Sequence, residues 1–190
     1  MNKVKSVVID DFFPDPDAIR NWGLSLQYYD KDQLMEVAPP QYGLKYYYPG
    51  VRSLPLSQLK SPYSEAIQTS IATMSKQFFG LKGQMNIITA FQLTTEKDYV
   101  LNNIHVDSGK NSAYPISVAS VIYLTPNAPY DTGTNIYTDE EPHDLVDSIG
   151  NLYNRVTLYK SESYHRANRY FGDNLENGRL TLVSFIRNVT

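Results

Sequence analysis

The hydrophobic and polar positions divide the chain into a helical N-terminal part and a longer part with the periodicity of strands. An apolar run over residues 4–9 predicts a short first strand. An Asp-Pro pair then precedes a helix predicted from residue 16 to about residue 28, and a Ser-Pro pair precedes a second helix predicted over residues 62–79. The apolar positions of the second helix fall on one stripe, at Ile67, Ile71, Met74 and Phe78.

Between the two predicted helices, residues 30–59 hold a Pro-Pro pair, a Pro-Gly pair and several tyrosines. This composition favours a long ordered loop or short hairpins over a helix. Tyr46, Tyr47 and Tyr48, together with Trp22, are candidates for lining a substrate pocket. Aromatic side chains in a loop that packs over a sheet more often belong to the core, so the core assignment is preferred for these four residues.

Beyond Gly83 short runs rich in Val, Ile, Thr and Tyr are separated by Gly, Asn, Asp and Pro, which predicts β-strands. The expected strands lie near residues 84–94, 103–108, 116–125, 134–138, 153–160, 163–169 and 179–187. Helices followed by about eight antiparallel strands indicate an α+β fold whose core is a jelly roll, that is, a cupin-like double-stranded β-helix with the N-terminal helices packed on it. We expect residues 1–190 to form one domain, with a helical and loop part at 1–82 and the jelly-roll core at 83–190.

The composition limits the partners and the chemistry. The formal net charge is -3 and no run of Lys and Arg occurs, so neither nucleic acid nor an anionic membrane surface is expected as a partner. No apolar stretch approaches the ~20 residues that cross a bilayer, and acidic residues interrupt the N-terminal run, which predicts a soluble, cytoplasmic protein. The chain has no cysteine and 3 histidines, so any metal must be bound by histidine and carboxylate.

One histidine and one carboxylate are expected on the same side of a strand. Alternation along the predicted strand at 103–108 places His105 and Asp107 on one face. His165, on a distant predicted strand, would complete a set of two histidines and one carboxylate around a metal. This facial set leaves coordination positions open and is associated with non-haem Fe(II) oxygenases. Each residue alone is more often structural, but their combination in this order favours a metal site.

A later strand carries an arginine among apolar residues. Arg179 and Thr181 share a face of the predicted strand at 179–187. An inward guanidinium is costly without an anion, and its planar fork matches a carboxylate with two parallel hydrogen bonds. An inward Arg179 therefore implies a bound dicarboxylate, to which Thr181 would add a hydroxyl donor.

The order HxD, then H, then RxT in a β-rich domain resembles the 2-oxoglutarate/Fe(II)-dependent dioxygenase superfamily. The resemblance rests on IHVD at 104–107, SVIYLTPNAPYDTGTNIY at 120–137, NRVTLYKSESYHRANRYFG at 154–172 and GRLTLVSFI at 178–186. These segments are similar to the prolyl-4-hydroxylase-like branch, which includes small oxygenases of phages and bacteria. Prolyl hydroxylases of this branch generally have lysine at the place of Arg179, so the match is to the superfamily rather than to proline as the substrate.

The resemblance implies iron on the His-Asp-His set, the distal carboxylate of 2-oxoglutarate on Arg179 and Thr181, and Tyr123 as a further contact to 2-oxoglutarate. Fe(II), 2-oxoglutarate and O2 would then hydroxylate an unactivated C–H bond with release of succinate and CO2, the oxidising power coming from metal and cosubstrate. The expected substrate is a protein side chain, a free amino acid or another small metabolite. A homodimer is one option for the oligomeric state, and a virus-encoded origin, with the protein in the host cytoplasm, is another implication of the phage-like resemblance.

Other functions stay open from the sequence. A catalytically inactive jelly-roll binding protein or viral accessory protein would keep the fold without turnover. A cupin-like metalloenzyme would use the same three ligands, but Arg179 and Thr181 would then lack a purpose. A hydrolase that pairs Ser108 with His105 is disfavoured, because no GxSxG motif is present.

Overall fold

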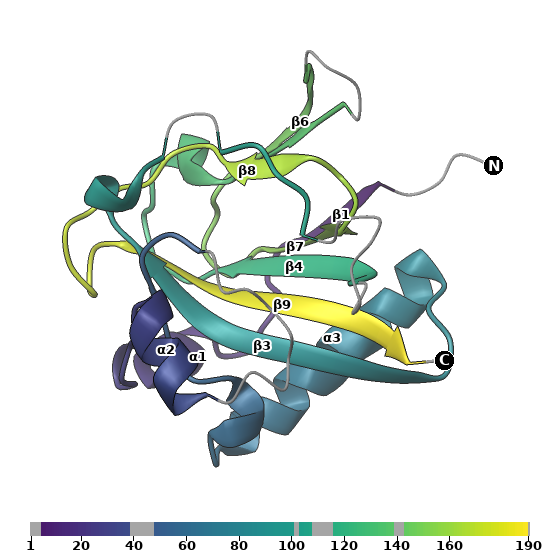
Figure 1. Cartoon of the computed structure of the whole chain (residues 1–190), viewed down its shortest axis with the longest axis horizontal. Helices are drawn as coiled ribbons and strands as arrows, with labels where there is room; N and C mark the ends of the chain where they lie inside the picture. The colour runs from purple at the N-terminus through teal and green to yellow at the C-terminus, as the bar shows by residue number, and fades with distance from the viewer. Residues whose placement is uncertain (1–4, 39–47, 101–102, 108–115, 139–142, 190) are drawn as a thin grey trace.

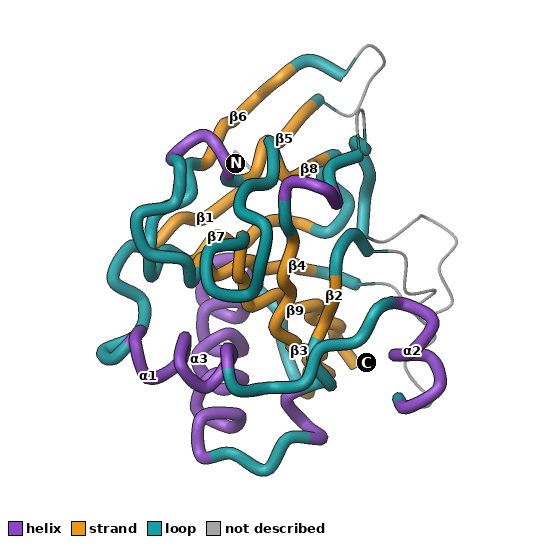
Figure 2. Tube along the Cα trace, turned by 90° about the vertical axis from the view of Figure 1, so that its left-hand side faces the viewer, coloured by secondary structure: helices purple, strands orange, loops and turns teal. Residues whose placement is uncertain are grey.

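The computed structural model describes residues 5–38, 48–100, 103–107, 116–138 and 143–189, which form helices and two antiparallel sheets (Figure 1). The larger sheet has the strand order β1-β7-β4-β9-β3-β2, and the smaller sheet has the order β6-β5-β8. The strands are Ser6–Ile9 (β1), Val51–Arg52 (β2), Gln84–Thr94 (β3), Val118–Tyr123 (β4), Thr134–Tyr137 (β5), Leu145–Ile149 (β6), Val156–Lys160 (β7), His165–Ala167 (β8) and Arg179–Val189 (β9). The two longest strands, β3 and β9, are neighbours in the larger sheet and pair along their whole length (Figure 2).

Helices make up most of the N-terminal part. They are Pro16–Leu24 (α1), Lys31–Val37 (α2) and Pro62–Phe79 (α3), with short 3-10 helices at Leu56–Gln58 (η2), Glu96–Asp98 (η3) and Tyr130–Thr132 (η4). The hydroxyl of Ser61 caps α3 by accepting from the amide of Tyr63, and Gly80 ends the helix in the left-handed region. None of the helices in the described ranges is long and apolar enough to cross a lipid bilayer.

The main core lies between one face of the larger sheet and the helices α1 and α3. Ile71 of α3, Phe91 of β3 and Ile122 of β4 are fully buried there. The ring of Trp22 on α1 meets Phe91 edge-on, with 5.3 Å between the ring centroids. Trp22 thus belongs to the core rather than to a pocket, which was the preferred expectation for this residue.

The other face of the larger sheet packs against the smaller sheet. Tyr123 and Val183 from the larger sheet contact Ile136 and Ile149 from the smaller one in a second core. The side chains of this second core fill only part of the space between the two sheets. The remaining part contains the candidate site described below.

The predicted combination of N-terminal helices and antiparallel strands is confirmed. The helix over 62–79 and the strand over 84–94 have the predicted bounds. The first helix ends at Leu24 instead of near residue 28, because the hydroxyl of Ser25 donates to the carbonyl of Trp22 at 2.7 Å and its amide caps the same turn. Local side-chain bonds of this kind compete with continuation of a helix.

Helix α2 and strand β6 were not predicted. Helix α2 lies in the segment expected to be a loop; Asp30 and Gln33 form its capping box, and Leu34 anchors it to the interior. Strand β6 escaped notice because four of its five residues are exposed, which hides the alternation that marks a half-buried strand.

The strand predicted at 103–108 is wrong as a regular strand. Within its described part, His105 forms an isolated bridge with His165. The amide of Asp107 bonds instead to the carbonyl of Ser161 at 3.0 Å. A step of two residues, from position 105 to 107, thus corresponds to a step of four residues, from position 165 to 161. The segment that pairs with 105–107 forms a turn between these positions, so a regular ladder cannot continue.

Substitution of Gly23 by alanine should destabilise the protein, although alanine favours helices by about 1 kcal/mol over glycine. A Cβ at Gly23 would lie 2.7 Å from the ring of Phe91, which the core holds in place. Overpacking of this kind costs about 1–3 kcal/mol, so we expect a net loss measurable by urea denaturation. Asn21→Ala is the control: it lies exposed on the same helix and should stabilise by a few tenths of a kcal/mol. An equal gain for both variants would contradict the packing argument.

Candidate metal centre

Main-chain hydrogen bonds bring the two predicted histidine ligands side by side. The amide of His105 donates to the carbonyl of His165 at 3.0 Å, and the amide of His165 donates to the carbonyl of His105 at 2.9 Å. The imidazole rings have centroids 4.5 Å apart. Asp107 is fixed two residues later by its bond to Ser161. The backbone alone therefore sets the relative positions of the three residues.

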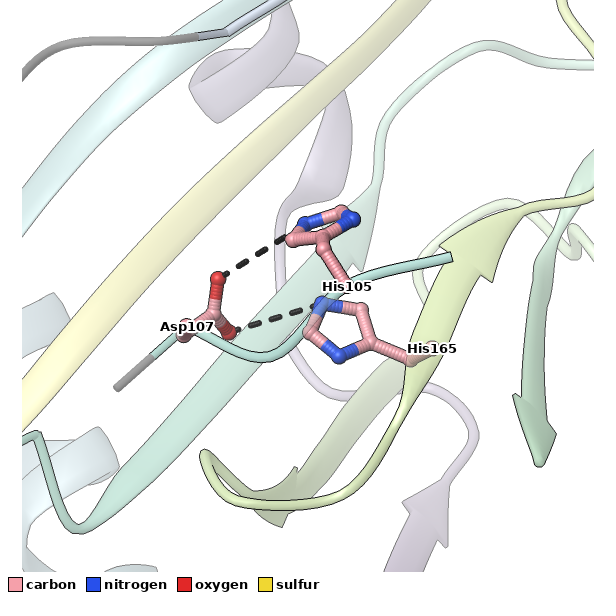
Figure 3. A group of neighbouring side chains, drawn as sticks. All are labelled: His105, Asp107 and His165. Carbon is pink, nitrogen blue, oxygen red and sulfur yellow. Dashed lines mark ion pairs between the residues drawn. The ribbon is translucent and has the colours of Figure 1, made fainter. Parts of the chain in front are cut away.

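The side chains of these residues converge on one point (Figure 3). Nε2 of His165 lies 3.5 Å from Oδ2 of Asp107, and Nε2 of His105 lies 4.0 Å from Oδ1 of Asp107. One ligand atom from each residue lies within 4.8 Å of the other two. The side chain of His165 is 6% exposed and that of His105 is 45% exposed. The group is thus buried on one side and open on the other, as a metal that binds further ligands requires.

Hydrogen bonds at the far side of each ring orient the two imidazoles. Nδ1 of His105 lies 3.0 Å from the carbonyl of Asn103, and Nδ1 of His165 lies 2.9 Å from the carbonyl of Ser163. A carbonyl can only accept, so each Nδ1 must carry the proton, and each neutral ring then presents an unprotonated Nε2 towards Asp107. Backbone carbonyls that accept from the other ring nitrogen orient metal-binding histidines in the same way.

The protonation state of His165 fits binding of a divalent cation. Burial lowers the pKa of His165, and this effect outweighs the charge of Asp107, which acts in the opposite direction. The 3.5 Å contact therefore joins a carboxylate to a neutral imidazole at neutral pH. Oδ2 of Asp107 is buried and has no hydrogen-bond partner among the residues that the structure describes. Such an orphaned carboxylate oxygen is unfavourable by itself, and a metal ion would satisfy it.

A cavity of about 350 Å³ adjoins the metal-ligand group between the two sheets. Its walls combine tyrosines, arginines and small apolar side chains. The polar and aromatic lining residues are Tyr48, Arg52, Gln92, Tyr99, Asn103, His105, Asp107, Ser120, Thr134, Tyr159, His165, Arg166, Tyr170, Arg179 and Phe185. A volume of this size suits a small molecule.

Arg179, the first residue of β9, lines the cavity and is 5% exposed. Its Nε donates to the carbonyl of Thr132 at 2.8 Å, and its Cζ lies 5.4 Å from the ring centroid of Tyr123 and 6.0 Å from that of Tyr170. In the ranges that the structure describes, no carboxylate forms an ion pair with Arg179. A buried guanidinium in this situation is suited to an anionic ligand.

The other two predicted contacts to 2-oxoglutarate lie behind the cavity wall. Thr181 is fully buried and donates to the carbonyl of Gln92 at 3.3 Å. The hydroxyl of Tyr123 lies 2.8 Å from Oγ1 of Thr134, and burial raises the pKa of this phenol. Neither Thr181 nor Tyr123 is among the residues that line the cavity, and their roles stay predictions.

Tyr48, a pocket candidate for which the core assignment was preferred, is 6% exposed, packs with Leu34 and Ala38 in a small core cluster and also lines the cavity. Tyr46 and Tyr47 lie outside the described residues, as does Ser108. The third histidine, His143, stacks on Tyr164 with ring centroids 4.1 Å apart and is not part of the ligand group.

Several cavity residues were missed by the sequence interpretation. Thr157 and Tyr159 of β7 share one face, and the apolar Val156 and Leu158 share the other. Alternation along the strand could therefore have shown that Tyr159 points away from the main core. Arg52 lies on a strand of two residues, too short for any periodicity, and Tyr170 lies in an irregular segment. Only contacts distant in sequence bring these two residues to the cavity.

Comparisons of sequence place most of the chain in an uncharacterised group of proteins. The profile of DUF6445, described as a family of unknown function, matches residues 1–147. This span includes His105 and Asp107 and ends before His165 and Arg179. None of the curated protein sequences compared with the chain matches it significantly.

Comparisons of structure find the same fold in known oxygenases. An oxidoreductase of the 2OG-Fe(II) oxygenase family from Burkholderia pseudomallei has a TM-score of 0.65 at 14% identity, with 98% of this chain and 86% of that chain covered. The collagen prolyl hydroxylase of Paramecium bursaria Chlorella virus-1, in its 2OG complex, has a TM-score of 0.62 at 11% identity, with 98% and 97% covered. A Pseudomonas putida prolyl-4-hydroxylase has a TM-score of 0.57 at 12% identity, with 98% and 94% covered. At these identities the comparisons establish a shared fold.

Proposed function

Because the chain belongs to the DUF6445 family, whose function is unknown, we propose its activity from the site and the fold: it is a non-haem Fe(II)- and 2-oxoglutarate-dependent oxygenase that hydroxylates a C–H bond. The observation that carries the proposal is the Asp107 carboxylate, whose buried Oδ2 has no hydrogen-bond partner among the described residues and which faces the Nε2 atoms of His105 and His165. Two histidines and one carboxylate with an open side form the ligand set of non-haem Fe(II) oxygenases.

The residues of this chain have separate roles in the proposed reaction. His105, Asp107 and His165 bind the metal through one face, while Arg179 binds the distal carboxylate of 2-oxoglutarate. The bond from Arg179 to the carbonyl of Thr132 holds its guanidinium in the cavity before any ligand binds. Such preorganisation lowers the entropic cost of binding.

Fe(II) in this site supplies the activation of O2 that couples oxidation of 2-oxoglutarate to hydroxylation of the substrate. The reaction balances when one oxygen atom of O2 enters succinate, formed with CO2 from 2-oxoglutarate, and the other converts the substrate C–H into C–OH. Burial, and secondarily the charge of Asp107, raise the pKa of Tyr159 well above its usual value, so the phenol beside His165 stays neutral throughout the physiological pH range. Tyr159 therefore adds no charge to the metal site.

A jelly-roll topology of the prolyl-4-hydroxylase-like branch is part of the proposal. Support comes from the two facing antiparallel sheets and from the likeness to oxygenase folds at TM-scores of 0.57 to 0.65. An inactive binding protein is the weaker candidate, since it gives no reason to keep a buried carboxylate oxygen without a described hydrogen-bond partner next to two imidazoles.

Anaerobic titration of the metal-free protein with Fe(II), and then with 2-oxoglutarate, tests the proposal. We expect a weak visible charge-transfer band when 2-oxoglutarate chelates the iron, and succinate formation when air is admitted. Arg179→Ala should need at least tenfold more 2-oxoglutarate to develop the band, because the distal carboxylate loses a charge-assisted bidentate partner. Arg169→Ala, an exposed arginine paired with Asp131, is the matched control and should titrate as wild type. Absence of both the band and succinate in the wild-type protein would rule out the activity.

A further inference from the structure

Tyr159 of β7 extends from the sheet face that carries Arg179 and reaches the metal-ligand group. It pairs in register with Ala119 of β4, and Ala119 pairs with Phe185 of β9. Directly opposite residues of antiparallel strands share a face, and Phe185 shares that face with Arg179 by alternation along β9. The ring of Tyr159 packs on the imidazole of His165, with 4.5 Å between the centroids. Tyr159 and Arg179 both line the cavity.

The hydroxyl of Tyr159 has no partner among the described residues. The residue is 3% exposed, yet its hydroxyl forms no hydrogen bond to any part of the chain that the structure describes. The hydroxyl of Tyr123, on the same sheet face, bonds instead to Thr134. A hydroxyl that leaves water without a new partner is unfavourable. Phenylalanine would pack on His165 equally well, so the hydroxyl of Tyr159 points to a ligand in the cavity.

The charges that act on this phenol indicate where it lies in the cavity. Burial is the main cause of the raised pKa of Tyr159, while the charge of Asp107 raises this pKa further and the charge of Arg179 lowers it. The phenol is thus within electrostatic reach of the metal-ligand group and of the arginine. A ligand that extends from the metal to Arg179 passes close to it.

The metal end of the cosubstrate needs a hydrogen-bond donor. The 1-carboxylate and the 2-keto oxygen of 2-oxoglutarate can only accept, and a neutral phenol can donate. The small side chain of Ala119, directly opposite Tyr159, leaves space beside the ring. We propose that the Tyr159 hydroxyl donates a hydrogen bond to the 2-oxo acid end of 2-oxoglutarate, while Arg179 binds the distal carboxylate. This inference rests on the proposed function and assigns a residue to the end of the cosubstrate that Arg179 does not bind.

Oxalate and 2-oxoglutarate together distinguish the two ends. Oxalate chelates a metal as the 2-oxo acid does, but it lacks the distal carboxylate. Each ligand is titrated anaerobically into the Fe(II)-loaded protein by calorimetry. Tyr159→Phe should weaken both ligands by about tenfold and leave Fe(II) binding as in wild type, because a hydrogen bond to a charged group is lost. Arg179→Ala should weaken 2-oxoglutarate alone. Tyr63→Phe, which alters an exposed tyrosine of α3, is the matched control and should bind both ligands as wild type.

The stability of the metal-free protein gives an independent test. Since the hydroxyl has no partner in the described chain, Tyr159→Phe should unfold at the same temperature as wild type or at a higher one. Differential scanning calorimetry measures the midpoint. A lower midpoint, or a variant that does not fold, would show that the hydroxyl already has a partner in the protein and would overturn the inference.

Three ligand-binding results would also contradict the proposed hydrogen bond. The first is a Tyr159→Phe variant that binds both ligands as wild type. The second is a loss of affinity for 2-oxoglutarate alone, which would move the hydroxyl to the distal half of the cosubstrate. The third is an intense phenolate-to-iron band in the Fe(III) protein that disappears in Tyr159→Phe, which would make the phenol a metal ligand.

Failure of the inference and failure of the proposed function give different readings. A visible band that develops at the same 2-oxoglutarate concentration in wild type and in Tyr159→Phe leaves the oxygenase assignment intact and removes the role of Tyr159. Absence of the band in the wild-type protein contradicts the oxygenase assignment. Oxalate titrated into the Mn(II)-loaded protein then still reports whether Tyr159 recognises a metal-bound dianion.

Discussion

Mn(II) at one hundred times its dissociation constant should stabilise the wild-type protein by about 2.7 kcal/mol, and His165→Ala should lose all of this gain at the same concentration. For a chain of this size the gain corresponds to a rise of roughly 5–10 °C in the unfolding midpoint. The physical reason is that the metal satisfies Asp107 and both imidazoles in the folded state alone. Differential scanning calorimetry in the presence and absence of Mn(II) measures the effect.

His143→Ala is the matched control for this experiment, because it removes the remaining histidine of the chain without touching the ligand group. Its Mn(II) response should equal that of the wild-type protein. A response that persists in His165→Ala, or disappears in His143→Ala, would locate the metal elsewhere.

Gly133→Ala should be the most damaging single methyl group that can be added near the site. A Cβ there would lie 1.8 Å from the carbonyl oxygen of Ile149, which is backbone and cannot rotate away. Strands β5 and β6 would have to separate, and we expect the free energy of unfolding to fall by about 3 kcal/mol or more. Since the carbonyl of the preceding Thr132 holds Arg179, the affinity for 2-oxoglutarate should fall as well.

Gly80→Ala is the control variant, because it introduces backbone strain without a steric clash. Gly80 has a φ of +69°, but a Cβ there would meet nothing within 4 Å. Gly80→Ala should lower the free energy of unfolding by about 1 kcal/mol and leave 2-oxoglutarate binding unchanged. Urea denaturation and the iron titration measure both quantities, and equal losses in the two variants would refute the role of the close approach at Gly133.

The fold could be predicted from the sequence where local signals and burial agree. Helix α3 has a capping serine, an apolar stripe and a terminal glycine, so both of its ends were found. Helix α2 also has a capping box, but the sequence interpretation followed the prolines and tyrosines of the same segment, which favour a loop or short hairpins. Strand β6 is mostly exposed and carries no alternation. Its pairing with β5 arises from tertiary context, which a local pattern does not record.

The site was predictable to the extent that its residues follow strand alternation. His105 and Asp107 do converge with His165, although an isolated bridge replaces the expected strand. Residues two apart in any extended segment point to the same side, so the prediction of a shared face did not depend on a regular strand. Arg52 and Gln92 were not predicted, since their place in the cavity depends on the pairing of β2 with β3, forty residues apart. Register between distant strands is a property of the folded chain.

The reciprocal backbone bonds between positions 105 and 165 separate the framework of the candidate metal centre from the identity of its proposed ligands. Peptide groups hold the two positions together whatever side chains they carry. Exchange of a ligand side chain therefore alters the metal without dismantling the scaffold, and the metal preference of this fold can diverge through one or two substitutions. In protein engineering, this makes positions 105 and 165 suitable sites for installing ligands that favour a different transition metal.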